Sequence, residues 1–168
     1  MEVIFTSSTE AIGSIDYTYQ TTPFGEMLVA WHADALCFAT FTTYLGRKRA
    51  FAELQALFYR AQFNKIENHT SIFDITPQKI LLAGTPFRQD VWRALLGVER
   101  GTTISYSELA RRSNHPTAVR AVATSVGRNP ISVIVPCHRI LPLTGGIGNY
   151  HSGAEIKRRL LEWEGALP

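Results

Sequence analysis

The stretch Val133-Ile134-Val135-Pro136-Cys137-His138-Arg139-Ile140 places a cysteine, a histidine and an arginine directly after an apolar run. Because valine and isoleucine are β-branched, the run predicts a buried strand that ends at the proline. A cysteine reacts as its thiolate, which a neighbouring base or cation favours. We therefore interpret Cys137 as a nucleophile with His138 as its base. The alternative is a small core cysteine before a surface His-Arg pair.

The overall composition is that of an ordinary globular protein of one or two small domains, with 45% hydrophobic and 18% charged residues among 168. We find no apolar run long enough to cross a bilayer and no signal-peptide pattern at the start. We therefore expect a cytosolic protein, or a nuclear one in a eukaryote, without a membrane partner. Cys37 and Cys137 are far apart, which predicts neither a disulfide framework nor a metal site.

Positive charge is concentrated in the second half of the chain. Residues 1–85 hold six Lys and Arg against eight Asp and Glu, whereas residues 86–168 hold eleven against six. A basic half is what binding to phosphates requires, although a solvated surface would also explain the bias.

The first half predicts a small antiparallel sheet followed by a helix. Apolar runs at residues 27–32 and 36–41 predict two strands joined by a short hairpin, and residues 22–25 predict a turn before them. Cys37 falls in the second strand, so we expect it in the core. Between residues 47 and 62 the apolar residues recur at helical spacing, which indicates an amphipathic helix.

The second half predicts three helices. Thr85-Pro86 begins a helix that runs to Leu96, and a capping box at residues 105–108 begins a second one that runs to about Arg112. After a break at residues 114–116, a third helix is expected from Thr117 to Val126. Its apolar side would carry three valines, and its opposite side would carry Thr117, Arg120, Ala121, Thr124 and Arg128. This pattern is typical of a helix-turn-helix, although many such helix pairs are only packing units.

Proline and glycine at positions 77 and 84 mark the expected domain boundary. We predict an N-terminal α/β domain over residues 1–83. A C-terminal domain over residues 84–168 would carry both the helix-turn-helix and Cys137.

A series of short motifs resembles the O6-alkylguanine-DNA alkyltransferase family. In chain order they are Gly84-Thr85-Pro86-Phe87, Val91-Trp92, Ile104-Ser105-Tyr106, Ala118-Val119-Arg120-Ala121-Val122, Asn129-Pro130, Pro136-Cys137-His138-Arg139, Gly148-Asn149-Tyr150 and Trp163-Glu164-Gly165. The resemblance covers residues 84–165 and is weak before them. It implies a two-domain α/β (α+β) protein with a ribonuclease-H-like N-terminal domain and a C-terminal winged or helix-turn-helix domain that carries the active-site cysteine. It implies no cofactor, and the cysteines that hold a structural zinc in some members are missing here.

The activity implied by this resemblance is DNA repair by direct reversal, as a methylated-DNA-protein-cysteine S-methyltransferase. An alkyl group on guanine O6 lies inside the base stack, so the nucleotide has to be flipped out before Cys137 can accept the alkyl group. The resulting thioether has no hydrolytic exit, so each molecule would act once. The expected partner is double-stranded DNA containing O6-alkylguanine, or O4-alkylthymine, bound through the minor groove by a monomer.

The resemblance also assigns roles to the helix-turn-helix and to the residues around Cys137. Arg120 would fill the space left by the flipped base, while Ala121 would let its helix approach the minor groove. His138 would accept the thiol proton through a bridging water, because neighbours on an extended segment point to opposite sides. Glu164 would orient His138. Arg139 would position the turn.

The last turn of the terminal helix gives independent support for Glu164. The helix macrodipole disfavours an anion there, so a cation partner is expected to offset the cost. Ser152 is expected to cap the start of the same helix.

Three further assignments concern the base itself. Tyr106 would hydrogen-bond the flipped base, and backbone N–H groups near Tyr150, His151 and Ser152 would meet O6. Asn129 would tie the recognition helix to the active-site strand. The family commonly has small residues where this chain has His151-Ser152, which puts acceptance of large alkyl groups in question.

Two other classes compete with this interpretation. A thiol hydrolase with a Cys-His-Glu triad would explain the catalytic residues but neither the helix-turn-helix nor the basic half. A non-catalytic DNA-binding regulator would explain the helix-turn-helix but not a buried Cys-His-Arg sequence, and related lesion-binding proteins lack the cysteine. The alkyltransferase hypothesis uses all of these features.

Overall fold

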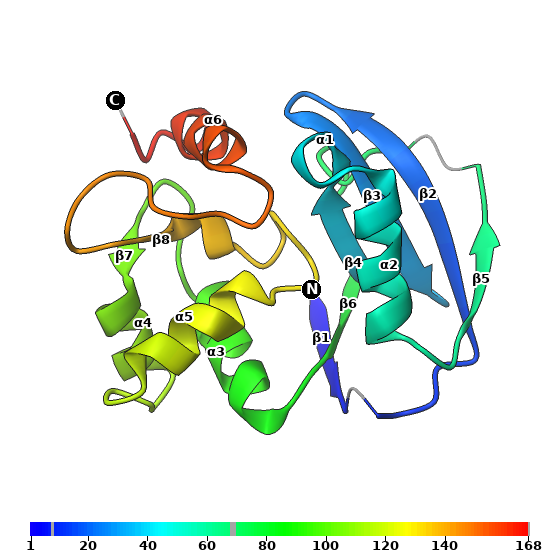
Figure 1. The fold of residues 1–168 in the computed structure, drawn as a ribbon, viewed down its shortest axis with the longest axis horizontal. Coiled ribbons are helices and arrows are strands. Elements are labelled where there is room, and N and C mark those ends of the chain that lie inside the picture. The colour runs from blue at the N-terminus through cyan, green and yellow to red at the C-terminus, as the bar shows by residue number, and fades with distance from the viewer. Residues whose placement is uncertain (8, 68–69, 168) are drawn as a thin grey trace. The chain divides into compact units, whose positions relative to one another are not determined.

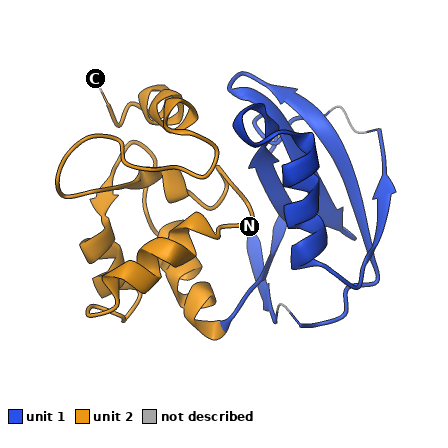
Figure 2. Ribbon diagram, viewed as in Figure 1, with its two compact units in different colours: residues 1–85 blue, residues 86–168 orange. Residues whose placement is uncertain are grey.

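The structure is a computed structural model that describes residues 1–7, 9–67 and 70–167. The chain divides into two compact units, residues 1–85 and residues 86–168 (Figure 2). The boundary expected after residue 83 lies two residues before this division.

The first unit is built on a six-stranded mixed sheet with strand order β1-β6-β4-β3-β2-β5 (Figure 1). Its strands are β1 (Glu2–Thr6), β2 (Ser14–Thr22), β3 (Gly25–His32), β4 (Ala35–Phe41), β5 (Gln62–Lys65) and β6 (Lys79–Ala83). The predicted antiparallel arrangement is confirmed for β2, β3 and β4. It is wrong for the rest of the sheet, since β1–β6, β4–β6 and β2–β5 pair in parallel. Parallel neighbours need crossover connections, which the local hairpin pattern does not indicate.

Two short helices follow β4, namely α1 (Thr42–Leu45) and α2 (Arg47–Leu57). The helix predicted over residues 47–62 therefore ends five residues early. Residues 62–65 instead extend the edge of the sheet as β5 beside β2. Pairing with an open sheet edge satisfies their backbone groups better than another helical turn on the surface would.

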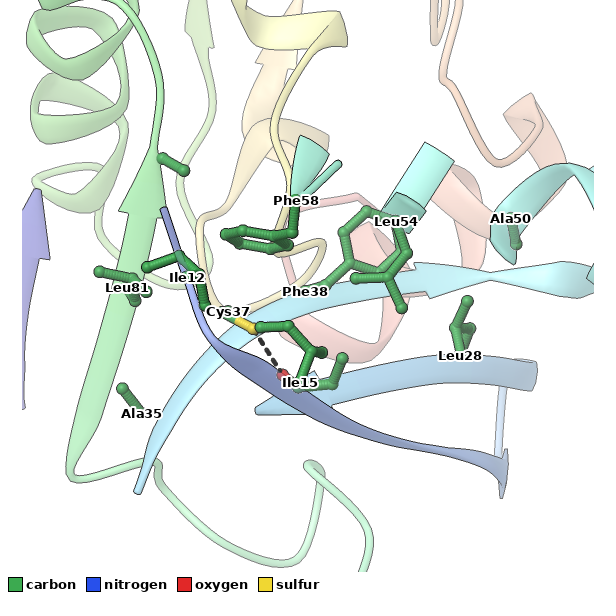
Figure 3. Close-up of a cluster of buried hydrophobic side chains, with 12 residues drawn as sticks. Ile12, Ile15, Leu28, Ala35, Cys37, Phe38, Ala50, Leu54, Phe58 and Leu81 are labelled. Carbon is green, nitrogen blue, oxygen red and sulfur yellow. Dashed lines mark hydrogen bonds between the residues drawn. The ribbon is translucent and has the colours of Figure 1, made fainter. Parts of the chain in front are cut away.

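The core of the first unit forms where α2 packs on the sheet. Figure 3 shows Ala50 and Leu54 of the helix with Leu28 of β3 and Phe38 of β4 among the buried side chains. Cys37 is fully buried in this cluster, as predicted, and its Sγ donates to the carbonyl of Ala30 at 3.4 Å.

The second unit contains the predicted helices and two very short strands. Its elements are α3 (Pro86–Leu96), β7 (Ile104–Ser105), α4 (Tyr106–Arg112), α5 (Val119–Gly127), the 3₁₀ turn η1 (Cys137–Arg139), β8 (Ile140–Leu141) and α6 (Ala154–Glu164). The capping box of α4 is confirmed, because Ser105 Oγ accepts from Glu108 N at 3.1 Å. α5 begins two residues later than predicted, since the Ala118 N–H bonds back to the carbonyl of His115 and closes a turn first.

The apolar run before Pro136 is not the predicted strand. Only an isolated bridge joins Ser132 to Val135, and Val133 has a positive φ of 75°. A β-branched residue adopts that conformation only where its surroundings hold it there. The tertiary environment therefore overrides the β propensity of this run, and Cys137 and His138 lie in a 3₁₀ turn rather than on an extended segment.

Within the described residues, no helix combines the length and the apolar character needed to span a bilayer.

Candidate active site around Cys137

Cys137 begins the η1 turn, and its side chain is buried among polar groups. Asn129 Nδ2 lies 3.0 Å from Cys137 Sγ, and the hydroxyl of Tyr150 lies 4.0 Å from the same sulfur. Burial raises the pKa of the Cys137 thiol above its ordinary value, although its hydrogen bonds with Asn129 and Tyr150 and the charge of Lys157 oppose this effect. The sulfur therefore rests as a thiol at neutral pH and needs a base in order to react.

Asn129 is the central hydrogen-bonding residue of the loop before the cysteine. Its Nδ2 donates to the carbonyl of Val135 at 2.7 Å, and its Oδ1 accepts from Ile131 N at 3.0 Å. These bonds join the residue that follows the end of α5 to the loop before Cys137, where an active-site strand was expected. The direct contact of the same amide with Cys137 Sγ is a role that the sequence did not indicate.

His138 is completely buried beside Cys137 in the chain. Its Nε2 lies 3.1 Å from Glu164 Oε1, but the pair does not have the geometry of a hydrogen bond. Among the described residues, Nδ1 has no hydrogen-bond partner. Burial lowers the pKa of His138, while the carboxylate of Glu164 opposes that shift. The imidazole is therefore neutral at neutral pH, which is the form able to accept a proton.

Glu164 is shared between His138 and Arg139. Arg139 Nε donates to Oε2 at 2.9 Å and its Nη2 donates to Oε1 at 2.7 Å, so the guanidinium holds the carboxylate with both arms. The carboxylate side chain is only 2% exposed. Burial alone would raise the pKa of Glu164, but the close contact with His138, the hydrogen bonds from Arg139 and the charges of both residues outweigh it and hold the pKa at about 2. Arg139 is thus a cation partner of the kind expected for an anion at this helix end.

Lys157 is a buried residue that the sequence analysis missed. It is fully buried in α6, where its Nζ donates to the carbonyl of Ile140 at 2.6 Å. Burial lowers its pKa to about 8, so it remains largely an ammonium at neutral pH. The helical spacing could have indicated its burial, because Lys157 shares the inward face of α6 with Ile156, Leu160 and Leu161.

A pocket of about 770 Å³ opens beside Cys137. Three of the predicted substrate residues, Tyr106, Tyr150 and His151, line it together with the cysteine. Burial raises the pKa of both tyrosines, and the negative charge of a Cys137 thiolate adds to the effect, so both hydroxyls remain donors.

Ser152 does not belong to that lining. Its side chain is only 1% exposed, and its Oγ has no hydrogen-bond partner in the described part of the chain. The predicted cap at Ser152 is wrong, because α6 begins after Gly153, whose positive φ of 95° sets the entry of the chain without a side-chain cap. The serine side chain is buried instead.

The outer face of α5 matches the predicted pattern of exposure. The five residues assigned to DNA contact are all exposed, namely Thr117, Arg120, Ala121, Thr124 and Arg128. Val122 and Val126 are buried on the opposite face, and Trp92 Nε1 of α3 anchors the helix by donating to the carbonyl of Ser125 at 2.9 Å. Thr124 also lines the pocket, so the exposed helix face adjoins the pocket that holds Cys137.

No cluster of three or more His, Cys, Asp or Glu able to hold a metal ion occurs within residues 1–7, 9–67 and 70–167.

Comparison with known proteins gives consistent results for sequence and structure. A family model described as "6-O-methylguanine DNA methyltransferase, DNA binding domain" matches residues 86–166. A methylated-DNA–protein-cysteine methyltransferase of Haemophilus influenzae is 34% identical over 158 residues, which cover 88% of this chain and 85% of that protein. The structure of the Mycobacterium tuberculosis O6-methylguanine methyltransferase matches with a TM-score of 0.73 at 30% identity, over 90% of this chain and 93% of that one.

A further structure, of the Mycobacterium tuberculosis protein in complex with DNA, matches with a TM-score of 0.73 at 31% identity, over 89% of this chain and 92% of that one. The expected two-domain α/β fold is confirmed by these structures. Because the similarity extends over both units in sequence and in fold, the chain belongs to the methylated-DNA–protein-cysteine methyltransferase family.

Proposed function

We propose that this protein repairs double-stranded DNA by transferring the alkyl group of O6-alkylguanine to Sγ of Cys137, once per molecule. The observation that carries the proposal is the position of Cys137. Its thiol lies in a pocket wall that also includes Thr124 of the exposed α5 face. A base that leaves the duplex at α5 would therefore find the pocket, and the nucleophile in it, close at hand.

The transfer is a displacement at the alkyl carbon. The S–C bond forms while the C–O6 bond breaks, and the electron pair of that bond leaves with guanine. The Tyr106 hydroxyl and backbone N–H groups near Tyr150 would meet the developing charge on the base. The product is a thioether, which water does not hydrolyse, so the protein is consumed stoichiometrically.

The proton of the thiol passes to His138. Burial keeps this imidazole neutral, and its Nδ1 has no partner within the described residues, so it is free to receive a proton through a bridging water. Asn129 donates to Sγ and so stabilises the thiolate as it forms. Glu164 stabilises the imidazolium that results.

DNA is bound through the minor groove by the exposed face of α5. Arg120 would occupy the space that the flipped nucleotide leaves, and Ala121 would permit close approach, while Thr117, Thr124 and Arg128 contact the backbone. The protein would act as a monomer, in the cytosol or in the nucleus of a eukaryote.

O4-alkylthymine is a second substrate of the same chemistry, and the half-exposed imidazole of His151 in the pocket wall would disfavour bulky alkyl groups.

The test is the mass of the protein after reaction with excess duplex that contains O6-methylguanine. We expect one added methyl group, on the peptide that contains Cys137 and not on the one that contains Cys37. Release of the methyl group with continued turnover would instead support the hydrolase alternative.

A second experiment tests base flipping. Arg120→Ala should slow transfer from duplex DNA at least about tenfold while leaving the reaction with free O6-benzylguanine unchanged, because only the duplex requires extrusion of a base. An equal loss with both substrates would remove Arg120 from this role.

A further inference from the structure

Arg139 is the one residue of the η1 turn that the proposed reaction leaves unused. Its guanidinium is held by both oxygens of Glu164 and, through Nη1, by the carbonyl of Val98. Its side chain is 13% exposed, so these bonds form largely out of contact with water. A planar guanidinium that is hydrogen-bonded at all three nitrogens has a fixed orientation, and it also fixes the orientation of the carboxylate bound to it.

The carboxylate therefore has two partners at once, a guanidinium and an imidazole. Glu164 Oε1 accepts from Arg139 Nη2 at 2.7 Å and lies 3.1 Å from His138 Nε2. The shorter and better aligned bond belongs to Arg139. Because an arginine remains charged at every relevant pH, part of the negative charge of Glu164 is already balanced before His138 takes up a proton.

We propose that Arg139 is a positioning residue of this site, which shares the charge of Glu164 and thereby keeps His138 in the neutral form that accepts the thiol proton. The inference rests on the proposed function only in taking His138 as the base of Cys137. It assigns to Arg139 an electrostatic task beyond holding the turn.

The charged and titratable groups that act on His138 are few. Glu164 and Lys157 act on it from α6, and Arg139 acts from within the η1 turn, which also carries the Cys137 thiol. Burial lowers the pKa of His138 first, the Glu164 carboxylate raises it, and the charges of Arg139 and Lys157 lower it again. Loss of the arginine would leave Glu164 with an unshared charge and would favour the imidazolium at higher pH.

The experiment follows the rate at which iodoacetamide alkylates Cys137 between pH 5 and pH 9, read as the mass of the Cys137 peptide. We expect the wild-type rate to rise with pH until His138 is neutral and then to level off. In Arg139→Gln, the midpoint of that rise should move upward by about one pH unit, since a charge close to a titrating group has been removed. Arg139→Lys retains the charge and should keep the wild-type midpoint.

Two further variants separate this electrostatic role from a structural one. Arg100 lies over the ring of Trp163 at the same end of α6, with its Cζ 4.1 Å from the ring centroid, and Arg100→Gln should leave the midpoint unchanged. The double variant Arg139→Gln/Glu164→Gln leaves no unpaired buried carboxylate, so it should fold even if the single variant Arg139→Gln is unstable. Removing Arg139 from Glu164→Gln should move the midpoint less than removing it from the wild type, because most of the effect of the arginine passes through the carboxylate.

A uniformly lower rate with an unchanged midpoint in Arg139→Gln would overturn the proposal. A shift between Glu164→Gln and the double variant as large as the shift between the wild type and Arg139→Gln would also overturn it. Iodoacetamide requires neither DNA nor O6-alkylguanine. A wild-type protein that failed to accept methyl groups from DNA would therefore contradict the proposed function, while the midpoints would still decide the role of Arg139.

Discussion

The two cysteines of this protein occupy buried positions of opposite character. Cys37 lies on β4 among apolar side chains. Within the described part of the chain, the one hydrogen bond of its Sγ goes to a backbone carbonyl. Cys137 lies in the η1 turn, where its sulfur contacts Asn129 and Tyr150 at the wall of a pocket. Burial raises the pKa of both thiols. The two sites therefore differ in their neighbouring polar groups and in access to a pocket, not in the depth of burial.

Exchanging the two cysteines for alanine is the most direct test of this comparison. Cys137→Ala should abolish alkyl transfer, because the nucleophile is gone, whereas Cys37→Ala should retain the wild-type transfer rate. Cys37→Ala should instead lower the free energy of unfolding by about 1 kcal/mol through loss of core contacts. Single-turnover transfer and urea denaturation measure the two effects. A loss of transfer in Cys37→Ala without unfolding would break the comparison.

The amide of Asn129 should be the next most sensitive feature. Asn129→Ala removes the donor to Cys137 Sγ and both bonds that hold the loop, so we expect transfer to fall by about 100-fold and stability by about 1–3 kcal/mol. Asn129→Asp keeps the acceptor for Ile131 but puts a negative charge beside the sulfur, so it should raise the pKa of Cys137 further. Transfer in this second variant should recover with rising pH, and a flat pH profile would count against the contact with sulfur.

Glu164→Gln should slow transfer about tenfold at neutral pH, since the charge that stabilises the imidazolium is lost. Raising the pH should restore part of the rate, because the thiol then ionises without help. Single-turnover transfer across pH measures this, and superimposable profiles for the two proteins would show that Glu164 does not act on His138.

The same variant should change the response of stability to acid. The pKa of Glu164 is lowered from 4.5 to about 2 on folding, so its contribution is fully present above about pH 4.5 and is lost as the pH falls towards 2. Thermal unfolding followed down to pH 2 should show a shallower decline in Glu164→Gln than in the wild type.

Lys157→Met should slow the reaction of Cys137 less than the substitutions at Cys137, Asn129 and Glu164 do. The ammonium of Lys157 favours the thiolate of Cys137 below its pKa of about 8, so the variant should react about threefold more slowly at pH 7 and at nearly the wild-type rate above pH 9. Stability at pH 7 should be equal or slightly higher, because the cost of burying a cation is removed. Iodoacetamide kinetics and thermal melting check both parts, and a rate difference that persists above pH 9 would contradict the electrostatic role.

Much of the architecture of the second unit could be predicted from local patterns. Pro86 and Leu96 delimit α3 as predicted, and Ser105 caps α4 through the bond that the capping box implies. These features depend on residues close in sequence, so propensity and spacing suffice. The exposure of Arg120 and Thr124 on α5 follows in the same way from helical periodicity.

The sequence by itself therefore determined the helices of the second unit and the hairpin of β3 and β4 in the first, and it predicts Cys137 as the reactive cysteine. Tertiary structure alone decided the parallel outer strands, the turn at Val133 and the sharing of Glu164 between His138 and Arg139. The physical reason is the range of the interactions. Capping and periodicity act over a few residues, whereas strand pairing and the balance of charge around Cys137 depend on groups that only folding brings together.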